Sequence, residues 1–260
     1  IHSAAPYQAP KRAWQHFQAA HGKKLRIAVI IDSPIDSPVS DEAIKAVEQA
    51  RNFLSEKGHQ VEMISYPVNG NEIITSYYLM NGAETAAMFS GIEKGMKRPV
   101  EKNDMELMTW GIYQYGKKIP ASHFVNALNQ WDYAAFKMEE LFTKYDLLLT
   151  PTTAETAPKL SDHLVSDEVR DALEAAATLT ESELLHLIDR MFEKSLQITP
   201  YTQLANLTGQ PAISLPTHVT SEGLPLGIQF TAARGREDLL LQVGKVFEVE
   251  YGFKLPEYYQ

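Results

Sequence analysis

The strongest constraint on the fold is the nearly unbroken apolar run LRIAVII at residues 25–31. A run of this kind is typical of a strand that is buried on both faces, as in the parallel sheets of α/β proteins. Ser40 then begins a helix over residues 41–57, because its hydroxyl can cap the first turn and acidic residues follow it there. Gly58 ends this helix, and residues 60–64 read as the next strand. The sequence therefore predicts a β-α-β unit with a right-handed crossover and parallel strands.

The rest of the chain continues the alternation of strands and helices. Short apolar segments predict further strands at residues 146–149, 212–215 and 227–231. Apolar residues at helical spacing predict helices at residues 73–89, 121–143, 166–195 (in pieces), 200–208 and 237–250. Along residues 121–143 the predicted buried stripe consists of Phe124, Leu128, Trp131, Ala135, Met138 and Phe142. Gly91 and Pro216 are expected to end the elements that precede them. The predicted fold class is α/β, with a mixed sheet flanked by helices on both faces.

Composition excludes several classes of function. The 260 residues suffice for one large domain, and the net charge of -9 argues against nucleic acid or an anionic membrane as the main partner. The chain has no cysteine, and its eight histidines show no metal-ligand spacing, so we expect no metal and no disulfide. No apolar run approaches the ~20 residues of a membrane span and no signal peptide is visible, so we expect a cytoplasmic location. Between Ile31 and Ser40 there is no glycine, which argues against a dinucleotide-phosphate cradle.

Four segments in the second half of the chain carry a family resemblance. They are YDLLLTPT at residues 145–152, NLTGQPAISLP at 206–216, GLPLGIQF at 223–230 and EDLLLQV at 237–243. Their sequences and spacing resemble the carboxyl-terminal signature of the amidase-signature hydrolases, and the resemblance spreads over most of residues 25–253. It implies an amidase-signature-type mixed sheet, here as a partial domain over residues 25–260, with residues 1–24 as an irregular entry segment.

The resemblance also implies a chemistry, cleavage of an amide carbon–nitrogen bond by a Ser-cisSer-Lys group without a cofactor. In that family both serines lie in a G-G-S-S-[GA]-G segment whose backbone N–H groups form the oxyanion hole. This chain has no adjacent serines and no Gly-Gly pair, and the lysines that could act as a base, such as Lys24 and Lys45, lie on a strand edge and a solvated helix face. We therefore expect the carboxyl-terminal part of an amidase that contains none of the catalytic residues. Its first residue, Ile1 rather than Met, fits a fragment or a processed product.

The resemblance places the wall of the substrate pocket in two parts of this chain. The candidate substrate-binding residues are Thr152, Thr153, Thr202, Gln203 and Ala205. Thr202 and Ala205 are three residues apart and would share one face of a helix. The alternative is that these residues only pack strand against helix. Asn206 is expected to bond the backbone in the turn at Gly209 rather than a substrate.

The expected partner is a small-molecule amide, bound together with the missing amino-terminal part. If amino-terminal strands are missing, an uncovered sheet edge should also lead to self-association or to binding of a partner fragment. Two alternatives stay open. One is a non-catalytic binding or scaffold protein with an amidase half-fold, and the other is part of a subunit similar to the amidotransferase A chain.

Overall fold

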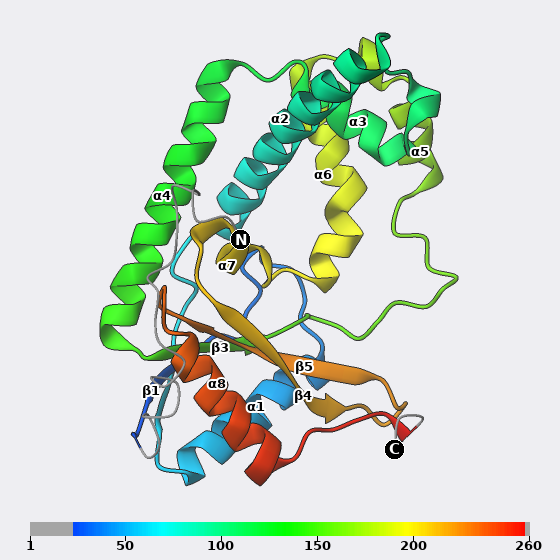
Figure 1. The fold of residues 1–260 in the computed structure, drawn as a ribbon. Coiled ribbons are helices and arrows are strands. Elements are labelled where there is room, and N and C mark those ends of the chain that lie inside the picture. Colours follow the sequence, from blue (N-terminus) through cyan, green and yellow to red (C-terminus); the bar gives the residue numbers. More distant parts are fainter. Residues whose placement is uncertain (1–22, 258–260) are drawn as a thin grey trace. The chain divides into compact units, whose positions relative to one another are not determined.

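The computed structural model describes residues 23–257 of the chain (Figure 1). These residues divide into two compact units, each formed by segments that are far apart in the sequence. The first unit contains residues 23–68, 135–157 and 198–257, and the second contains residues 69–134 and 158–197. The irregular segment predicted at residues 1–24 lies outside the described residues, except for its last two.

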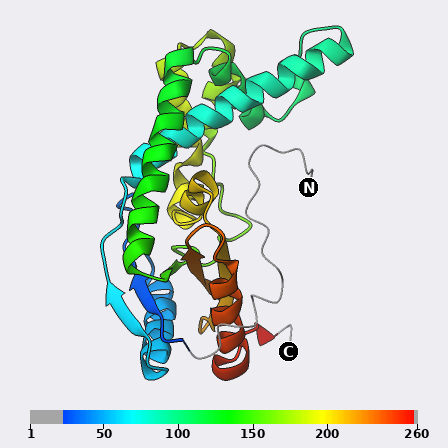
Figure 2. The ribbon, with the colours of Figure 1, turned by 60° about the vertical axis from the view of Figure 1, so that its left-hand side comes forward.

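The first unit is built on one five-stranded sheet. Its strands are β1 (Arg26–Val29), β2 (Gln60–Met63), β3 (Leu147–Pro151), β4 (Ala212–Val219) and β5 (Pro225–Ala232), in the order β2-β1-β3-β5-β4. β1 pairs in parallel with β2 and β3, whereas β5 pairs antiparallel with β3 and β4. Figure 2 shows β2 (cyan) at one edge of the sheet, beside β1 (blue). The predicted mixed sheet and the predicted parallel β-α-β unit are both confirmed.

Helices of the first unit cover both faces of this sheet. Figure 1 shows α1 (Asp41–Glu56) and α8 (Glu237–Val246) on one side and α7 (Gln203–Thr208) on the other. The main core lies under α1 and α8, where fully buried side chains such as Val47 and Phe247 meet Leu149 and Phe230 of the sheet. A π-helical turn, η4 (Phe247–Tyr251), follows α8, and the rings of Phe230 and Phe247 are 5.7 Å apart. The apolar residues of the strands thus supply the side chains that these helices bury.

The second unit contains helices and connecting loops in its described residues. They are α2 (Gly70–Met96), η2 (Lys102–Asp104), α3 (Leu107–Gly116), the first part of α4 (Ala121–Lys144), α5 (Asp167–Glu174), η3 (Ala176–Thr178) and α6 (Glu181–Ile198). α2 and α3 lie side by side in Figures 1 and 2, and their backbones meet where Gly82 faces Gly116. None of the helices within residues 23–257 has the length and apolar character that a membrane span requires.

The predicted helix at residues 73–89 is longer in the structure than its sequence indicated. α2 continues through Gly91 and Gly95 to Met96. Glu93 anchors the additional turns, because its carboxylate accepts hydrogen bonds from Val100 N–H at 3.0 Å and from the Tyr113 hydroxyl at 3.1 Å. These contacts within the second unit outweigh the weak helix propensity of glycine, which was the basis of the predicted end.

β4 also extends beyond its predicted end at Pro216. Pro216 lies on an edge strand of the described sheet, where its missing N–H removes no bond to β5. Just after Leu215, β4 contains one residue more than the facing part of β5, which is a β-bulge. Thr217 and His218, which lie beyond the predicted end of the strand, are consequently both buried.

The buried stripe of α4 differs from the predicted one. Met138 is buried as expected, but Leu128 is 40% exposed. The residues of α4 that are buried are Ala127, Ala134, Met138 and Leu141. The buried face of α4 therefore includes two alanines and none of its aromatic side chains. A prediction that ranks residues by hydrophobicity alone places part of the buried face on the wrong side of the helix.

We predict that Gly116→Ala lowers the free energy of unfolding by about 2 kcal/mol or more, because overpacking at a close backbone contact forces backbone shifts. A Cβ at this position would lie 1.8 Å from the Gly82 carbonyl oxygen. Gly91→Ala is the matched control, since a Cβ there meets nothing within 4 Å. It should raise the free energy of unfolding by roughly 0.5–1 kcal/mol. Urea unfolding followed by circular dichroism measures both, and equal effects of the two substitutions would contradict the close approach of α2 and α3.

Candidate functional site

The candidate site lies at the carboxyl ends of β1 and β3, where three segments of the first unit are joined by hydrogen bonds. Ala154 N–H, in the loop after β3, donates to the Ile198 carbonyl at 2.8 Å, and Ser40 N–H donates to the Ala154 carbonyl at 2.9 Å. The Tyr201 hydroxyl donates to the carbonyl of Ile31, just after β1, at 2.6 Å. These bonds hold the loop after β3 beside the segment that leads into α7. Sheets of α/β proteins commonly bind ligands at this end of their strands.

Thr152 forms a hydroxyl pair with Ser214 on the surface of the sheet. The two side-chain oxygens are 2.7 Å apart, and Thr152 N–H donates to the Gly227 carbonyl at 3.0 Å. Gly227 makes room for the pair, because a Cβ there would lie 2.8 Å from Ser214 Oγ and 3.0 Å from Thr152 Oγ1. One hydroxyl donates to the other, so the second O–H remains available to an additional acceptor. Since Ser214 is exposed in this chain, the pair offers a small hydrogen-bonding surface.

Thr153 has a role within the loop itself. Its hydroxyl donates to the Glu155 carbonyl at 2.8 Å, which fixes the turn that follows β3. The side chain is half-buried. Thr153 therefore shapes the loop beside Thr152, and any contact with a ligand would come from the exposed part of its side chain.

The other three predicted residues lie at the start of α7, which begins at Gln203 rather than at the predicted Pro200. Thr202 is the N-cap residue and is partly exposed, and its side chain makes no capping bond. The Gln203 side-chain amide donates to the Thr199 carbonyl at 2.7 Å, so it closes the turn before the helix. Ala205 is only 8% exposed and faces the interior. Of the three, Thr202 is therefore best placed to meet a ligand.

The end of α7 is held by a residue that sequence reasoning did not find. Gly209 takes a left-handed conformation (φ 75°) as predicted, and Arg234 Nε donates to the Thr208 carbonyl at 2.9 Å just before it. Asn206 was expected to bond the backbone of that turn, but its side-chain amide donates to the Thr202 carbonyl at 3.3 Å. Arg234 follows β5 in the sequence and belongs to no recognisable motif, so only the fold brings it to this helix end.

Two tyrosines lie close together beneath the entry to α7, Tyr201 buried and Tyr66 half-buried. Burial raises the pKa of the Tyr66 phenol well above its usual range, and burial together with the nearby Tyr66 and Asp32 does the same for Tyr201. Both phenols therefore stay protonated at any ordinary pH. Tyr201 remains a hydrogen-bond donor to Ile31, which supports a structural rather than an acid–base role.

The two lysines considered as catalytic bases bond elsewhere in the structure. Lys24 Nζ donates to the Lys57 carbonyl, and Lys45 Nζ lies 3.7 Å from the Glu42 carboxylate. Within residues 23–257, no group of three or more His, Asp or Glu side chains is arranged to hold a metal ion. The chemistry that the described residues of this site offer is hydrogen bonding and shape.

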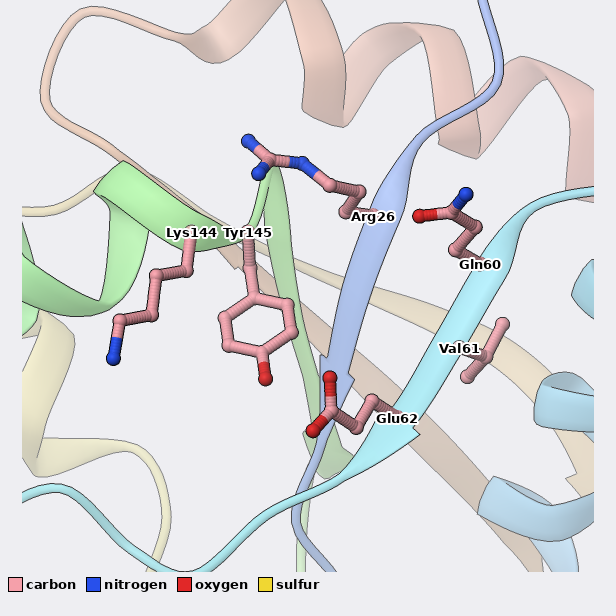
Figure 3. A pocket seen from close by; sticks show the side chains of 6 residues that line it. All are labelled: Arg26, Gln60, Val61, Glu62, Lys144 and Tyr145. Carbon is pink, nitrogen blue, oxygen red and sulfur yellow. The ribbon is translucent and has the colours of Figure 1, made fainter.

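A hollow of about 590 Å³ lies at the opposite, amino-terminal ends of β1 and β2 (Figure 3). It is lined by Arg26, Gln60, Val61, Glu62, Lys144 and Tyr145. The Tyr145 hydroxyl is hydrogen-bonded to Glu62, which raises the pKa of that phenol. The tyrosine of the YDLLLTPT segment thus bonds a strand-edge carboxylate at this end of the sheet, away from the predicted site residues.

Comparisons with known proteins agree with the fold. The Amidase family model matches residues 2–241. A lipoamidase from Enterococcus faecalis is 39% identical over 231 residues, which cover 88% of this chain and 32% of that protein. A 6-aminohexanoate-cyclic-dimer hydrolase from Pseudomonas sp. is 29% identical over 228 residues, covering 86% of this chain and 43% of that protein.

The fold of this chain is also similar to solved structures of amidase-signature enzymes. A solved structure of 6-aminohexanoate cyclic dimer hydrolase superposes with a TM-score of 0.77 and 25% identity, and the match covers 100% of this chain and 53% of that one. The chain spans about half, or less, of the length of each of these relatives. The match to the family model over nearly the whole chain, together with the shared mixed sheet, places this protein in the amidase family.

Proposed function

We propose that this chain is the carboxyl-terminal part of an amidase, and that the complete enzyme hydrolyses a carbon–nitrogen amide bond with a Ser-cisSer-Lys group supplied by sequence outside the chain. The observation that carries the proposal is the family match over residues 2–241 in a sequence that has no adjacent serines and no Gly-Gly pair. Covalent amide hydrolysis needs a nucleophile, a base and oxyanion donors, and this sequence offers no such combination.

In this proposal the serine oxygen attacks the amide carbon, the C–N bond breaks, and the amine leaves with a proton delivered by the base. Water then hydrolyses the acyl-enzyme. The present chain would supply one wall of the acyl pocket. Thr152, Thr153 and Thr202 border it, the Thr152–Ser214 hydroxyls offer a hydrogen bond, and Gln203 and Ala205 support the helix end from within. The substrate is a small-molecule amide.

We further propose that an open sheet edge recruits a second polypeptide, either a further copy or a partner fragment. β2 is a poor edge for this purpose because it is short and carries the exposed charge of Glu62. β4 is longer, and no other described strand pairs with its outer edge. The Pro211 carbonyl accepts from Ala232 N–H at 3.1 Å, so the backbone groups of Ala212, the next residue, face away from β5. The first half of β4 is therefore the expected pairing site.

The 260-residue chain should not hydrolyse amides, whereas the same chain extended upstream should do so through an acyl-enzyme. A panel of amide and ester substrates, assayed with a fluorophosphonate serine probe, measures both proteins. The proposal would be overturned if the purified 260-residue chain hydrolysed amides and still did so after treatment with the probe. An extended protein that carries the triad but turns over no amide or ester would favour a binding or scaffold role.

Thr202→Trp in the extended protein should raise the KM for bulky amides, because the indole narrows the acyl side of the pocket at a partly exposed position. We expect an increase of roughly tenfold or more, since a misfit of even one methylene group costs about 1–3 kcal/mol. Thr143→Trp, at an exposed position of α4, is the control. If bulky and small amides respond alike, Thr202 does not line the pocket.

The 260-residue chain should show a mass that rises with concentration in light scattering. Ala212→Lys should reduce this association, because a lysine on an edge strand opposes pairing with another strand. Ala177→Lys makes the same change at an exposed position of the second unit and should leave association unaltered. A monodisperse monomer over a wide concentration range would contradict association through the edge of β4. Equal effects of the two lysine substitutions would also contradict it.

A further inference from the structure

His218 is a buried histidine that the proposed chemistry does not use. Its side chain is 7% exposed, and its Nε2–H donates to Glu42 Oε2 at 2.5 Å. Glu42 belongs to the first turn of α1, 176 residues away in the sequence. A hydrogen bond from a buried imidazole to a carboxylate is charge-assisted and is among the stronger bonds that side chains make.

The bulge in β4 is what brings His218 to Glu42. β4 and β5 pair at Leu215–Ile228 and again at His218–Leu226, so one additional residue lies on β4 between the two pairs. Ile228 and Leu226 are two residues apart and point to the same face of the sheet, and Leu215 and His218 therefore also share that face. This is the face that α1 covers. In a regular strand without the bulge, residues three apart such as Leu215 and His218 would point to opposite faces.

The first turn of α1 in turn holds the loop of the candidate site. Ser40, the N-cap of α1, accepts a hydrogen bond from Ala43 N–H at 3.3 Å. Both its backbone N–H and its hydroxyl donate to the Ala154 carbonyl, each at 2.9 Å. Ala154 follows Thr152 and Thr153 directly, so the position of these threonines depends on where α1 begins.

We propose that His218 and Glu42 form a positioning pair, which clamps the first turn of α1 against β4 and thereby fixes the loop of Thr152 and Thr153. The positioning is a property of this chain alone, and its meaning as support for a substrate pocket rests on the proposed function. The side-chain hydrogen bond of His218 is to Glu42 rather than to a residue assigned to that pocket, so in this proposal it acts through α1.

The charges around the pair determine its pH dependence. Two groups act on Glu42, His218 from β4 and Lys45 from α1, and the hydrogen bond from His218 is the larger cause of the lowered pKa of Glu42. A carboxyl group with a lowered pKa in the folded state stabilises that state at a pH above its usual value of 4.5, and the effect is lost as the pH falls through the lowered value. The clamp should therefore hold at neutral pH and weaken on acidification.

Amide hydrogen exchange of the 260-residue chain, followed by NMR, tests the proposal at one bond. Ser40 N–H donates to Ala154, so its protection factor reports how firmly α1 holds the loop. In His218→Ala, the protection factor of Ser40 should fall roughly tenfold or more, as expected for a lost hydrogen bond to a charged group. The protection factor of Leu54, near the other end of α1, should stay unchanged. His218→Gln should restore much of the protection, because the glutamine amide can still donate to Glu42.

Lys45→Ala is the matched control, since it removes the exposed partner of Glu42 and leaves the buried one. It should leave the protection factor of Ser40 close to that of the unmodified chain. In the unmodified chain that protection factor should also drop below about pH 4.5, a change that His218→Gln should reduce.

Three results would overturn the proposal. They are an unchanged Ser40 protection factor in His218→Ala, an equal loss at Leu54, and a loss in Lys45→Ala as large as in His218→Ala. If His218→Ala does not fold, the acid titration of the unmodified chain and of His218→Gln decides. None of these measurements needs hydrolysis, so failure of the proposed amidase activity would be seen separately.

Discussion

Asp146 sets the register between β1 and β3, and the geometry of the candidate site depends on that register. Its carboxylate accepts hydrogen bonds from Arg26 N–H at 2.8 Å and from Lys23 Nζ at 2.9 Å, while its own N–H donates to the Arg26 carbonyl at 2.7 Å. Burial opposes ionisation, but these bonds outweigh it and hold the pKa of Asp146 below its usual range. Because β1 and β3 are parallel and aligned at Arg26 and Asp146, Ile31 and Thr152 both lie at the carboxyl-terminal end of the sheet.

The segments that identify the family are mostly structural in this chain. Asp146 aligns strands, Gly227 leaves space for two hydroxyls, and Gly209 ends α7. Within these segments, the hydroxyl-bearing side chains of Thr152 and Ser214 are half-buried and exposed, respectively, and they pair with each other. In the proposed function these residues belong to one wall of a pocket, and a wall needs a rigid backbone more than it needs reactive side chains.

Periodicity and capping residues were sufficient to predict the five described strands and most helices, because these features follow from local sequence, whereas the mixed pairing was implied by the family resemblance. What could not be predicted depends on contacts between distant residues. Glu93 extends α2 past Gly91, and Arg234, in the segment after β5, secures the end of α7. Among the candidate residues, Thr152 and Thr202 lie where a ligand could meet them, whereas Ala205 is buried, which a spacing of three residues does not reveal.

The bulge in β4 also affects how relatives should be compared with this protein. A relative whose strand lacks the additional residue would match this chain face for face up to Leu215. Beyond that point, each residue at the same count along the strand would point to the opposite face of the sheet. An ungapped alignment across Pro216 would then match His218 with a residue that points away from α1. Whether a relative has an equivalent of this histidine must therefore be decided by counting residues back from the hairpin after β4, because the pairing with β5 resumes at His218–Leu226 and continues at Val219–Pro225.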